Sequence, residues 1–344
     1  MVKEASSNPR PQDVARGVSR AQNPTMSVTV PAAIDAYLTD RASELSDSSI
    51  QNHRYQLKQF REWCNGPGET DSISAIEPLD LSKFRRYRSA DINPNTMYNQ
   101  LSVCRLFLRF CHRMGWCEEE IPNSIVLPTR AGRSRDDSID PDRVASILDK
   151  LETYRYASFD HVLLSLLWTC SFRIGAIRAF DVQDLHLNER WVDVVHRPET
   201  GTPLKNKEDS EREVNLHGWV CDVLRAWVKD VRPDVEDDHR REPLLSTQNG
   251  RVSRATIRRH VYNLTDCSGI DGGCDCVPDY AKCPSASVAP HDIRRSSITA
   301  WLDDGTDISL LSGRVDSSQS TLSEHYDVRT ETQKRELRRN AFDM

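Results

Sequence analysis

Lysine is scarce in this chain, and no long apolar run occurs in it. Of its 344 residues only nine are lysine against 37 arginines, and 33 aspartates outnumber 19 glutamates. No stretch approaches the roughly 20 apolar residues of a membrane-spanning helix, and the N-terminal segment contains no apolar core of a secretory signal. We therefore expect a soluble, cytoplasmic protein, whose length suggests about two domains.

The total charge says little about partners. A net charge of −6 argues at first against nucleic-acid binding, because lysine and arginine provide the affinity for phosphate. Scarce lysine with abundant aspartate, however, is typical of proteins from salt-loving microbes, in whose cytoplasm exposed charges are strongly screened. The local distribution of charge is therefore more informative than the total.

Two segments are locally basic. Residues 83–113 contain seven lysines and arginines and one acid, and residues 251–260 contain four arginines and no acid. Each could be a solvated helix face, but we predict phosphate contacts with DNA from ten of these side chains: Lys83, Arg85, Arg86, Arg88, Arg105, Arg109, Arg251, Arg254, Arg258 and Arg259. The aromatic residues at helical spacing in the N-terminal half are expected in the core rather than stacked on bases: Tyr55, Phe60, Trp63, Phe84, Tyr87, Tyr98, Phe107 and Phe110.

The apolar pattern predicts a helical domain in the first third of the chain. Residues 1–25 are polar, contain three prolines and predict a disordered arm. Helical periodicity with proline or polar starts then predicts an all-α domain at 26–127, with helices at 32–45, 50–63, 79–90 and 95–115. Residues 128–138, with a proline, a glycine and alternating charges, are expected to form a linker.

The remaining residues, 139–344, have a mixed pattern. Two segments alternate in the manner of strands, at 191–197 and 211–216, and a turn region with glycine and proline separates them. Six helices are predicted around them, at 141–151, 160–170, 217–231, 253–265, 291–303 and 319–326. The fold class is therefore expected to be mainly α with a small β-sheet (α+β).

The ten cysteines fall into two groups. Disulfides are not expected inside a cell, and six cysteines lie singly among apolar residues, where we expect buried thiols: Cys64, Cys104, Cys111, Cys117, Cys170 and Cys221. The other four lie in a short insertion with glycine and proline at 267–283: Cys267, Cys274, Cys276 and Cys283. Four thiolates could bind a structural zinc ion. Three cysteines with a histidine, or free thiols in a loop, are the alternatives.

Five residues of the second domain form a candidate catalytic set: Arg173, Lys205, His291, Arg294 and Tyr326. Taken singly, each has an ordinary structural explanation, such as a helix cap, an ion pair with a nearby aspartate, a solvated loop lysine or an interfacial aromatic ring. Their order changes this interpretation. An arginine follows a buried helix (CSFRI), a lysine lies between two strands, His-x-x-Arg begins a helix (PHDIRR), and a tyrosine comes late (HYD).

In this order the set resembles that of the tyrosine recombinase, or phage integrase, family, and the lysine-poor composition suggests the recombinases of halophilic archaea. The resemblance covers about 27–340. It implies a helical, SAM-like core-binding domain that clamps DNA, followed by a mixed α/β catalytic domain. It also implies double-stranded DNA with a specific recombination site as substrate, a homotetramer on two synapsed sites, and catalysis without metal or ATP.

The resemblance also implies a role for each residue. Tyr326 would attack the scissile phosphate and form a 3′-phosphotyrosyl bond, while Arg173 and Arg294 hold the non-bridging oxygens. Lys205 would protonate the departing 5′-oxygen. His291 would transfer a proton or bind a phosphate oxygen.

Two positions depart from the family pattern. The family commonly has an acid three residues after the first arginine, where this chain has Ala176; Asp181 or Asp184 could replace it, or the site could be looser. The family also has histidine or tryptophan before the tyrosine, where this chain has Arg314. Arg314 could donate to a phosphate oxygen, or could be a solvated side chain beside Asp316.

Other functions are compatible with the same residues. A type IB topoisomerase uses a similar set to relax supercoils as a monomer, but the small helical domain and the short chain favour a recombinase. A degenerate DNA-binding module with a zinc-stabilised loop would retain the fold without catalysis. The charged segment after Tyr326 could dock in a neighbouring protomer, as such tails do in the family, or remain solvated.

Overall fold

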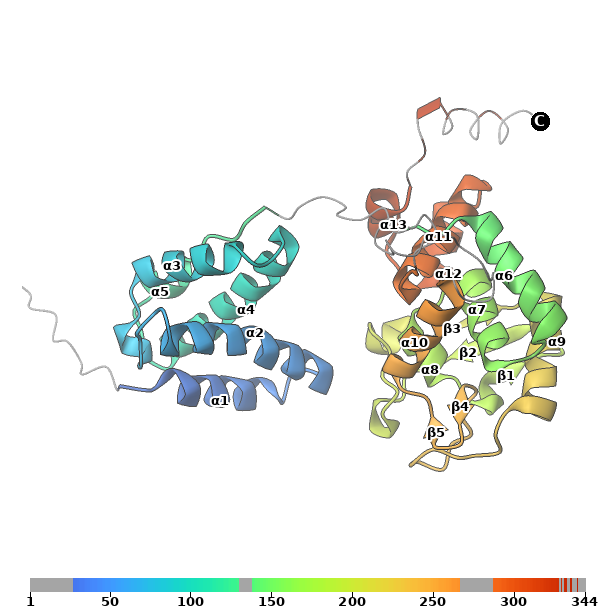
Figure 1. Ribbon diagram of the computed structural model, residues 1–344, viewed down its shortest axis with the longest axis horizontal. Helices are drawn as coiled ribbons and strands as arrows, with labels where there is room; N and C mark the ends of the chain where they lie inside the picture. Colours follow the sequence, from blue (N-terminus) through green and yellow to red (C-terminus); the bar gives the residue numbers. More distant parts are fainter. Residues whose placement is uncertain are drawn as a thin grey trace, which may run out of the picture. The chain divides into compact units, whose positions relative to one another are not determined.

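The computed structural model describes residues 27–129, 138–266 and 287–327, together with 329, 331, 332, 335 and 339. The chain divides into two compact units, residues 1–134 and 135–344 (Figure 1). Among the described residues, no helix is long and apolar enough to cross a membrane. The predicted N-terminal arm, the cysteine-rich insertion and most of the predicted linker lie outside the described residues.

The first unit is entirely helical. Its helices are α1 (Val30–Arg41), α2 (Asp47–Asn65), α3 (Pro78–Ser89), α4 (Pro94–Arg113) and α5 (Glu120–Asn123), with a 3₁₀ turn at Ile73–Ala75. Polar caps and prolines set the helix starts: Ser46 accepts a hydrogen bond from the Ser49 amide, and Asn93 accepts one from Thr96 ahead of Pro94. Gly115, with a φ of 75°, follows the end of α4.

Aromatic rings fill the core of the first unit. The rings of Phe84 and Phe107 pack edge-on against Phe60, with centroids 5.1 and 6.3 Å away. Two of the eight aromatic residues expected in the core are exposed instead, Tyr55 at 63% and Tyr87 at 47%. Both rings lie on a helix but outside its buried stripe. On α2, for example, that stripe runs along positions 56, 57, 60, 63 and 64.

In its described part, the second unit packs eight helices and short strands around a main core, and a smaller apolar cluster is formed by residues between 298 and 326. The helices are α6 (Pro141–Tyr154), α7 (Phe159–Cys170), α8 (Ile174–Ala179), α9 (Gly218–Ala226), α10 (Arg254–Thr265), α11 (Pro290–Asp303), α12 (Ile308–Val315) and α13 (Gln319–His325). A π-helical turn, Trp227–Val231, continues α9, and 3₁₀ turns occur at Val182–Asp184, Pro198–Thr200 and Lys207–Ser210. The central helix is α7, which contacts α6, α8, α9, α10 and α11. Neighbours cover nearly all of it, so most of its residues are apolar and even its polar side chains, such as Asp160 and Ser165, are buried.

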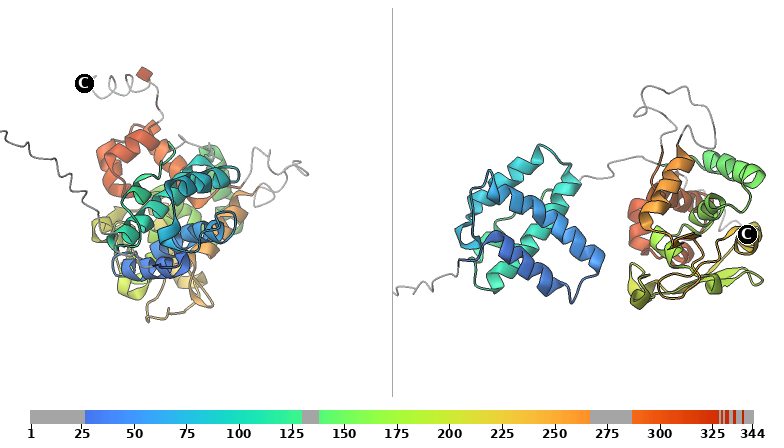
Figure 2. Two further views of the ribbon diagram at one scale, coloured as in Figure 1. Left: turned by 90° about the vertical axis from the view of Figure 1, so that its left-hand side faces the viewer. Right: turned by 60° about the horizontal axis from the view of Figure 1, so that its bottom comes forward.

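A small antiparallel sheet completes this unit. Its strands β1 (Leu185–His186), β2 (Trp191–Val194) and β3 (Arg212–Asn215) pair in that order, and β4 (Ser246–Thr247) forms a separate pair with β5 (Gly250–Arg251). In the right-hand view of Figure 2 the yellow-green strands lie along one edge of the unit, and α6, in green, lies at the opposite edge. The expected α+β class is confirmed. Helices α5, α8 and α12 and strands β1, β4 and β5 were not anticipated, because each is too short to show a period.

All six cysteines expected in the core are buried as free thiols. Burial raises the pKa of the Cys64 thiol to about 12 and that of Cys117 to about 11. These thiols are therefore protonated at neutral pH and act as small apolar side chains.

Candidate active site

Arg173 lies at the point where the buried helix α7 gives way to α8. Ser171 ends α7 in the left-handed conformation, with a φ of 51°, and Arg173 is the N-cap residue of α8. This turn directs Arg173 out of the core, so that 25% of its side chain is exposed. Its Nη1 donates to Oδ2 of Asp316 over 2.5 Å.

Asp181 and Asp184, which could have replaced the acid missing at Ala176, do not contact Arg173. Oδ2 of Asp181 accepts from Nε of Arg241 over 2.7 Å, and Oδ1 accepts from Nη2 of Arg251. Asp184 accepts two hydrogen bonds from Arg197, of 2.5 and 2.9 Å. The expectation that either aspartate serves Arg173 is therefore wrong, because other arginines already bind both carboxylates.

Arg294 is buried at the centre of the site. It follows His291 in the first turns of α11, which begins at Pro290, and its side chain is 1% exposed. Nη1 donates to the carbonyl oxygen of Ser171, and Nη2 donates to that of Val315 over 2.7 Å. Arg294 thus joins the turn after α7 to the end of α12. It does not pair with Asp292, whose carboxylate instead accepts from the Ala289 amide and caps α11.

Val315 links Arg294 to Tyr326, because its carbonyl accepts from Arg294 and its side chain packs in the same apolar cluster as Tyr326. Burial lowers the pKa of Arg294 to about 10 and the charge of Arg173 acts in the same direction, whereas the neighbouring Tyr326 raises that pKa. Arg294 remains fully charged at neutral pH. A buried guanidinium and the candidate nucleophile therefore share one place in the fold.

Two hydrogen bonds of its backbone groups, and apolar packing, hold Tyr326 there. It is the C-cap residue of α13, and its amide donates to the Leu322 carbonyl over 3.0 Å. Its carbonyl accepts from Oγ1 of Thr299 on α11 over 3.4 Å. The side chain is 7% exposed and packs with apolar residues of α11, α12 and α13: Ile298, Leu302, Leu311, Val315 and Leu322.

His291 is exposed beside several positive charges. Desolvation lowers its pKa first, and the charges of four neighbouring residues, Arg294, Arg295, Arg173 and Lys205, lower it further. Its imidazole is therefore neutral at neutral pH and able to accept a proton. Lys205, far away in sequence, lies in the same region, because its neighbour Asn206 and Arg173 both donate to the carboxylate of Asp316.

Lys205 lies in the connection between β2 and β3. The two strands pair from Trp191 with Asn215 to Val194 with Arg212, and Lys205 is exposed in the turn region between them. The turn is closed by the Asn206 amide, which donates to Oγ of Ser210 over 3.2 Å. The hairpin thus presents an ammonium group on a short, internally bonded loop, near His291.

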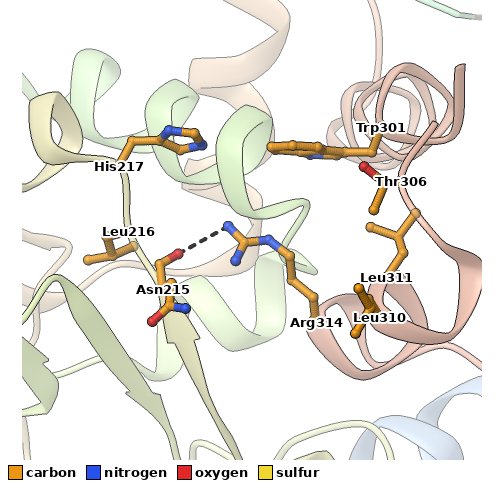
Figure 3. Close-up of a pocket in the computed structure, with 8 residues that line it drawn as sticks. All are labelled: Asn215, Leu216, His217, Trp301, Thr306, Leu310, Leu311 and Arg314. Carbon is orange, nitrogen blue, oxygen red and sulfur yellow. Dashed lines mark hydrogen bonds between the residues drawn. The ribbon is translucent and has the colours of Figure 1, made fainter. Parts of the chain in front are cut away.

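Arg314 is engaged by the protein rather than solvated beside Asp316. From the last turn of α12, its Nη2 donates to the carbonyl oxygens of Thr169 and Asn215 over 3.1 and 3.0 Å. The guanidinium carbon lies 5.9 Å from the ring centroid of Trp301. Figure 3 shows this side chain directed at the Asn215 backbone, in a pocket of about 290 Å³.

Two site residues, Arg212 and Asp316, were missed in the sequence. Arg212 of β3 donates from Nε to the Arg314 carbonyl over 2.9 Å and from Nη1 to the Ser210 carbonyl over 2.7 Å. Burial lowers its pKa to about 10, and the charge of Asp316 raises it. The alternation of residues 211–216 marked a strand, but no local signal showed which neighbours its arginine would meet.

The basic residues predicted to contact DNA are placed differently from one another. Seven are exposed: Lys83, Arg85, Arg86, Arg109, Arg254, Arg258 and Arg259. Arg88 donates to Gln100 and Arg105 to the Ile125 carbonyl, so both also hold the first unit together. Arg251 is wrong as a DNA contact, because its side chain is 5% exposed and all three of its nitrogens are bound within the protein.

The predicted zinc site is not tested by this structure. Its four cysteines, Cys267, Cys274, Cys276 and Cys283, lie outside the described residues. Among the described residues, no group of three or more histidines, cysteines, aspartates or glutamates could hold a metal ion.

Residues 137–330, more than half of the chain, match the model of the phage integrase family. The chain belongs to this family. The resemblance found in the sequence is therefore confirmed.

Relatives of this integrase-family chain span most of its length. It is 23% identical over 303 residues to the tyrosine recombinase XerC of Alcanivorax borkumensis, covering 86% of this chain and 89% of that protein. The structure of the Tn1549 transposon integrase with transposon right end DNA is similar, with a TM-score of 0.68 and 14% identity, over 91% of this chain and all of that one. A lambda integrase tetramer bound to a Holliday junction has a TM-score of 0.63 at 13% identity, over 89% of this chain and 80% of that one. These structural similarities support the fold.

Proposed function

We propose that this integrase-family chain is a site-specific DNA recombinase that cleaves and rejoins DNA through a 3′-phosphotyrosyl intermediate. The observation that carries the proposal is the buried Arg294, which donates to the carbonyl of Val315, a residue packed with Tyr326. Arg294 also donates to the carbonyl of Ser171, two residues before Arg173. A nucleophile next to two permanent positive charges is the arrangement that attack on a phosphodiester requires.

The cleavage step balances with these residues alone. The Tyr326 oxygen forms a bond to the scissile phosphorus, the bond from phosphorus to the 5′-oxygen breaks, and the 3′ end of the DNA stays attached to the protein. The neutral imidazole of His291 takes the phenol proton, and the ammonium of Lys205 gives a proton to the departing 5′-oxygen. Reversal of these transfers, with a 5′-hydroxyl from the partner strand as nucleophile, rejoins the DNA without metal or ATP.

Charge stabilisation falls to the guanidinium groups. Arg294 and Arg173 would bind the non-bridging oxygens, on which negative charge develops in the transition state. Arg314 has a supporting role in this proposal: its hydrogen bonds to Thr169 and Asn215 hold the end of α7 against β3. Because these bonds occupy its guanidinium, Arg314 is assigned to stabilising the site rather than to binding a phosphate.

The assembly in this proposal follows from the fold and its relatives. The exposed basic side chains of α3, α4 and α10 would contact the phosphates of double-stranded DNA carrying the recombination site. Because a lambda integrase of the same fold forms a tetramer on a Holliday junction, we propose a homotetramer on two synapsed sites. The reaction would take place in the cytoplasm, where the DNA is accessible.

A covalent-trapping selection tests this function without knowledge of the site. The full chain is incubated, with no added divalent metal and over a range of salt, with nicked duplexes whose central sequence is randomised. Protein-linked DNA is recovered under denaturing conditions and sequenced, with Tyr326→Phe in parallel. We expect adducts from the wild type that converge on one sequence, and none from the variant.

Two results would contradict the proposal. Tight binding without adducts at any salt concentration would favour a DNA-binding module, for which Ala176 and Arg314 are the supporting departures. Relaxation of supercoiled plasmid by a monomer, with no sequence convergence, would favour a topoisomerase-like enzyme.

A further inference from the structure

Asp316 occupies an unusual position next to Arg173. It is the C-cap residue of α12 in the left-handed conformation, with a φ of 53° and a ψ of 60°, and its side chain is 13% exposed. Residues other than glycine rarely adopt this conformation, although aspartate and asparagine tolerate it better than most. The backbone thereby turns the carboxylate back toward the site.

Both carboxylate oxygens of Asp316 are bound by side chains. Oδ2 accepts from Nη1 of Arg173 over 2.5 Å and from Oγ of Ser210 over 2.8 Å. Oδ1 accepts from Nδ2 of Asn206 over 2.8 Å. A carboxylate with three such donors, one of them charged, is held firmly in place.

The three donors come from two separate parts of the site. Arg173 lies at the start of α8. Asn206 and Ser210 lie in the connection between β2 and β3, directly after Lys205, and we call residues 205–210 the Lys205 loop. Ser210 is 1% exposed, and its hydroxyl also accepts from the Asn206 amide. One carboxylate therefore ties the Lys205 loop to the first arginine.

We propose that Asp316 is a positioning residue that holds the Arg173 guanidinium and the Lys205 loop in one fixed arrangement. The proposal rests on the recombinase function. It supplies, from α12, the carboxylate that is absent from α8 at Ala176. Arg173 keeps donors for a phosphate, because a guanidinium carries five N–H groups and Asp316 binds only one nitrogen.

This arrangement matters most for the proton that Lys205 delivers. A lysine side chain has several rotatable bonds, so its ammonium reaches the departing oxygen often only when the backbone that carries it is fixed. Displacing a catalytic group by about 1 Å costs on the order of 100-fold in rate. Loss of Asp316 should therefore impair protonation of the leaving group more than DNA binding.

A pair of substrates separates positioning from simple loss of structure. The selected duplex is made with its ordinary scissile phosphate, or with sulfur in place of the bridging 5′-oxygen. The sulfur leaves as a thiolate without needing a proton, because thiols have a pKa of about 8.5. Single-turnover adduct formation and DNA affinity are measured for the wild type, Asp316→Asn, Asn206→Ala and Lys205→Ala, with Asp304→Asn, an exposed aspartate, as the matched control.

On ordinary DNA we expect Asp316→Asn to form the adduct about 10- to 100-fold more slowly than the wild type, with its DNA affinity and melting temperature nearly unchanged. Asparagine is chosen because it accepts the left-handed conformation. On the sulfur-containing DNA the rate loss of Asp316→Asn relative to the wild type should become smaller. Only the loss caused by a displaced Arg173 should remain, because protonation by Lys205 is no longer needed. The smaller deficit of Asn206→Ala and the larger one of Lys205→Ala should nearly disappear, and Asp304→Asn should match the wild type on both substrates.

Each other outcome has a defined meaning. Equal deficits of Asp316→Asn on the two substrates, or no deficit on either, would overturn the role of Asp316 while the recombinase function stands. A wild-type chain that forms no adduct on either substrate would refute the recombinase function itself.

Discussion

Two clusters of arginine and aspartate lie in the second unit, and they differ in how fully the arginines are used. In the Asp181 cluster, every nitrogen of Arg241 and Arg251 is bound by a carboxylate, a hydroxyl or a backbone carbonyl. In the Asp316 cluster, a single carboxylate binds Arg173 and acts on Arg212. Arg173 is in turn one of four positive charges around His291, so positive charge is in excess there.

The arginines of the Asp181 cluster hold the fold together. In the proposed function, Arg173 of the Asp316 cluster keeps nitrogens that can bind a phosphate. Compensated charges in a buried network stabilise the structure only while all partners are present. An excess of positive charge at a partly open site is costly for the free protein and favourable once a phosphate arrives. Sequence alone does not distinguish the two, because both clusters contain the same residue types.

The largest expected effect concerns the compensated cluster. Arg251→Met leaves the carboxylates of Asp181 and Asp237 short of a partner inside the protein, and should lower the free energy of unfolding by about 3–5 kcal/mol. Chemical denaturation of the full chain measures it. A loss below about 1 kcal/mol would instead be typical of an exposed pair and would remove the contrast between the clusters.

The next effect concerns the uncompensated cluster. Arg173→Lys should slow adduct formation about 10²- to 10³-fold, because one ammonium cannot reproduce the bidentate contacts of a guanidinium. Its thermal stability should change little, since a quarter of the Arg173 side chain is exposed. A variant that unfolds more readily than Arg251→Met would show that Arg173 is mainly structural.

The pH dependence of cleavage tests the excess charge around His291. Because desolvation and neighbouring cations lower the pKa of His291, the imidazole stays neutral to a lower pH than an ordinary histidine, whose pKa is about 6.5. The cleavage rate should therefore hold as the pH falls through about 6.5 and decline only below it. His291→Gln should remove this decline, whereas an unchanged profile in that variant would exclude His291 as the proton acceptor.

The smallest effect concerns the exposed arginines. Arg258→Gln should weaken DNA binding a few-fold and reduce the slope of log affinity against log salt by about 0.9, the loss of one phosphate contact. Arg225→Gln, an exposed arginine of α9 paired with Asp222, serves as its control. Equal slopes for the wild type and Arg258→Gln would remove this residue from the DNA surface.

The sequence predicted residues whose position follows from local structure. Arg173 after an apolar helix, His291 and Arg294 at a helix start and Lys205 between two strands lie where periodicity and capping rules place them. Buried cysteines were likewise predictable from their apolar neighbours. The chemistry of the family then connected these separate signals.

What the sequence could not show depends on distant contacts. Asp316 meets Arg173 across 143 positions of the chain, and nothing near either residue marks the pair. In the sequence Arg251 directly precedes the basic residues 254–259, but in the structure it lies on β5, before the Ser253 cap that starts α10. Tyr55 has helical spacing from other aromatic residues of the sequence, but it lies outside the buried stripe of α2.

The positions of Asp316 and Tyr326 in the sequence also set the order in which the proposed site is assembled during synthesis. Both follow Arg173 and Lys205 by more than 100 residues, and the carbonyl of Val315, next to Asp316, accepts a hydrogen bond from Arg294. During synthesis the N-terminal unit emerges and folds before these residues are made. In the proposed function, a nascent chain that has not yet reached α13 would carry the exposed basic residues proposed to contact DNA but would lack the nucleophile proposed to cleave it.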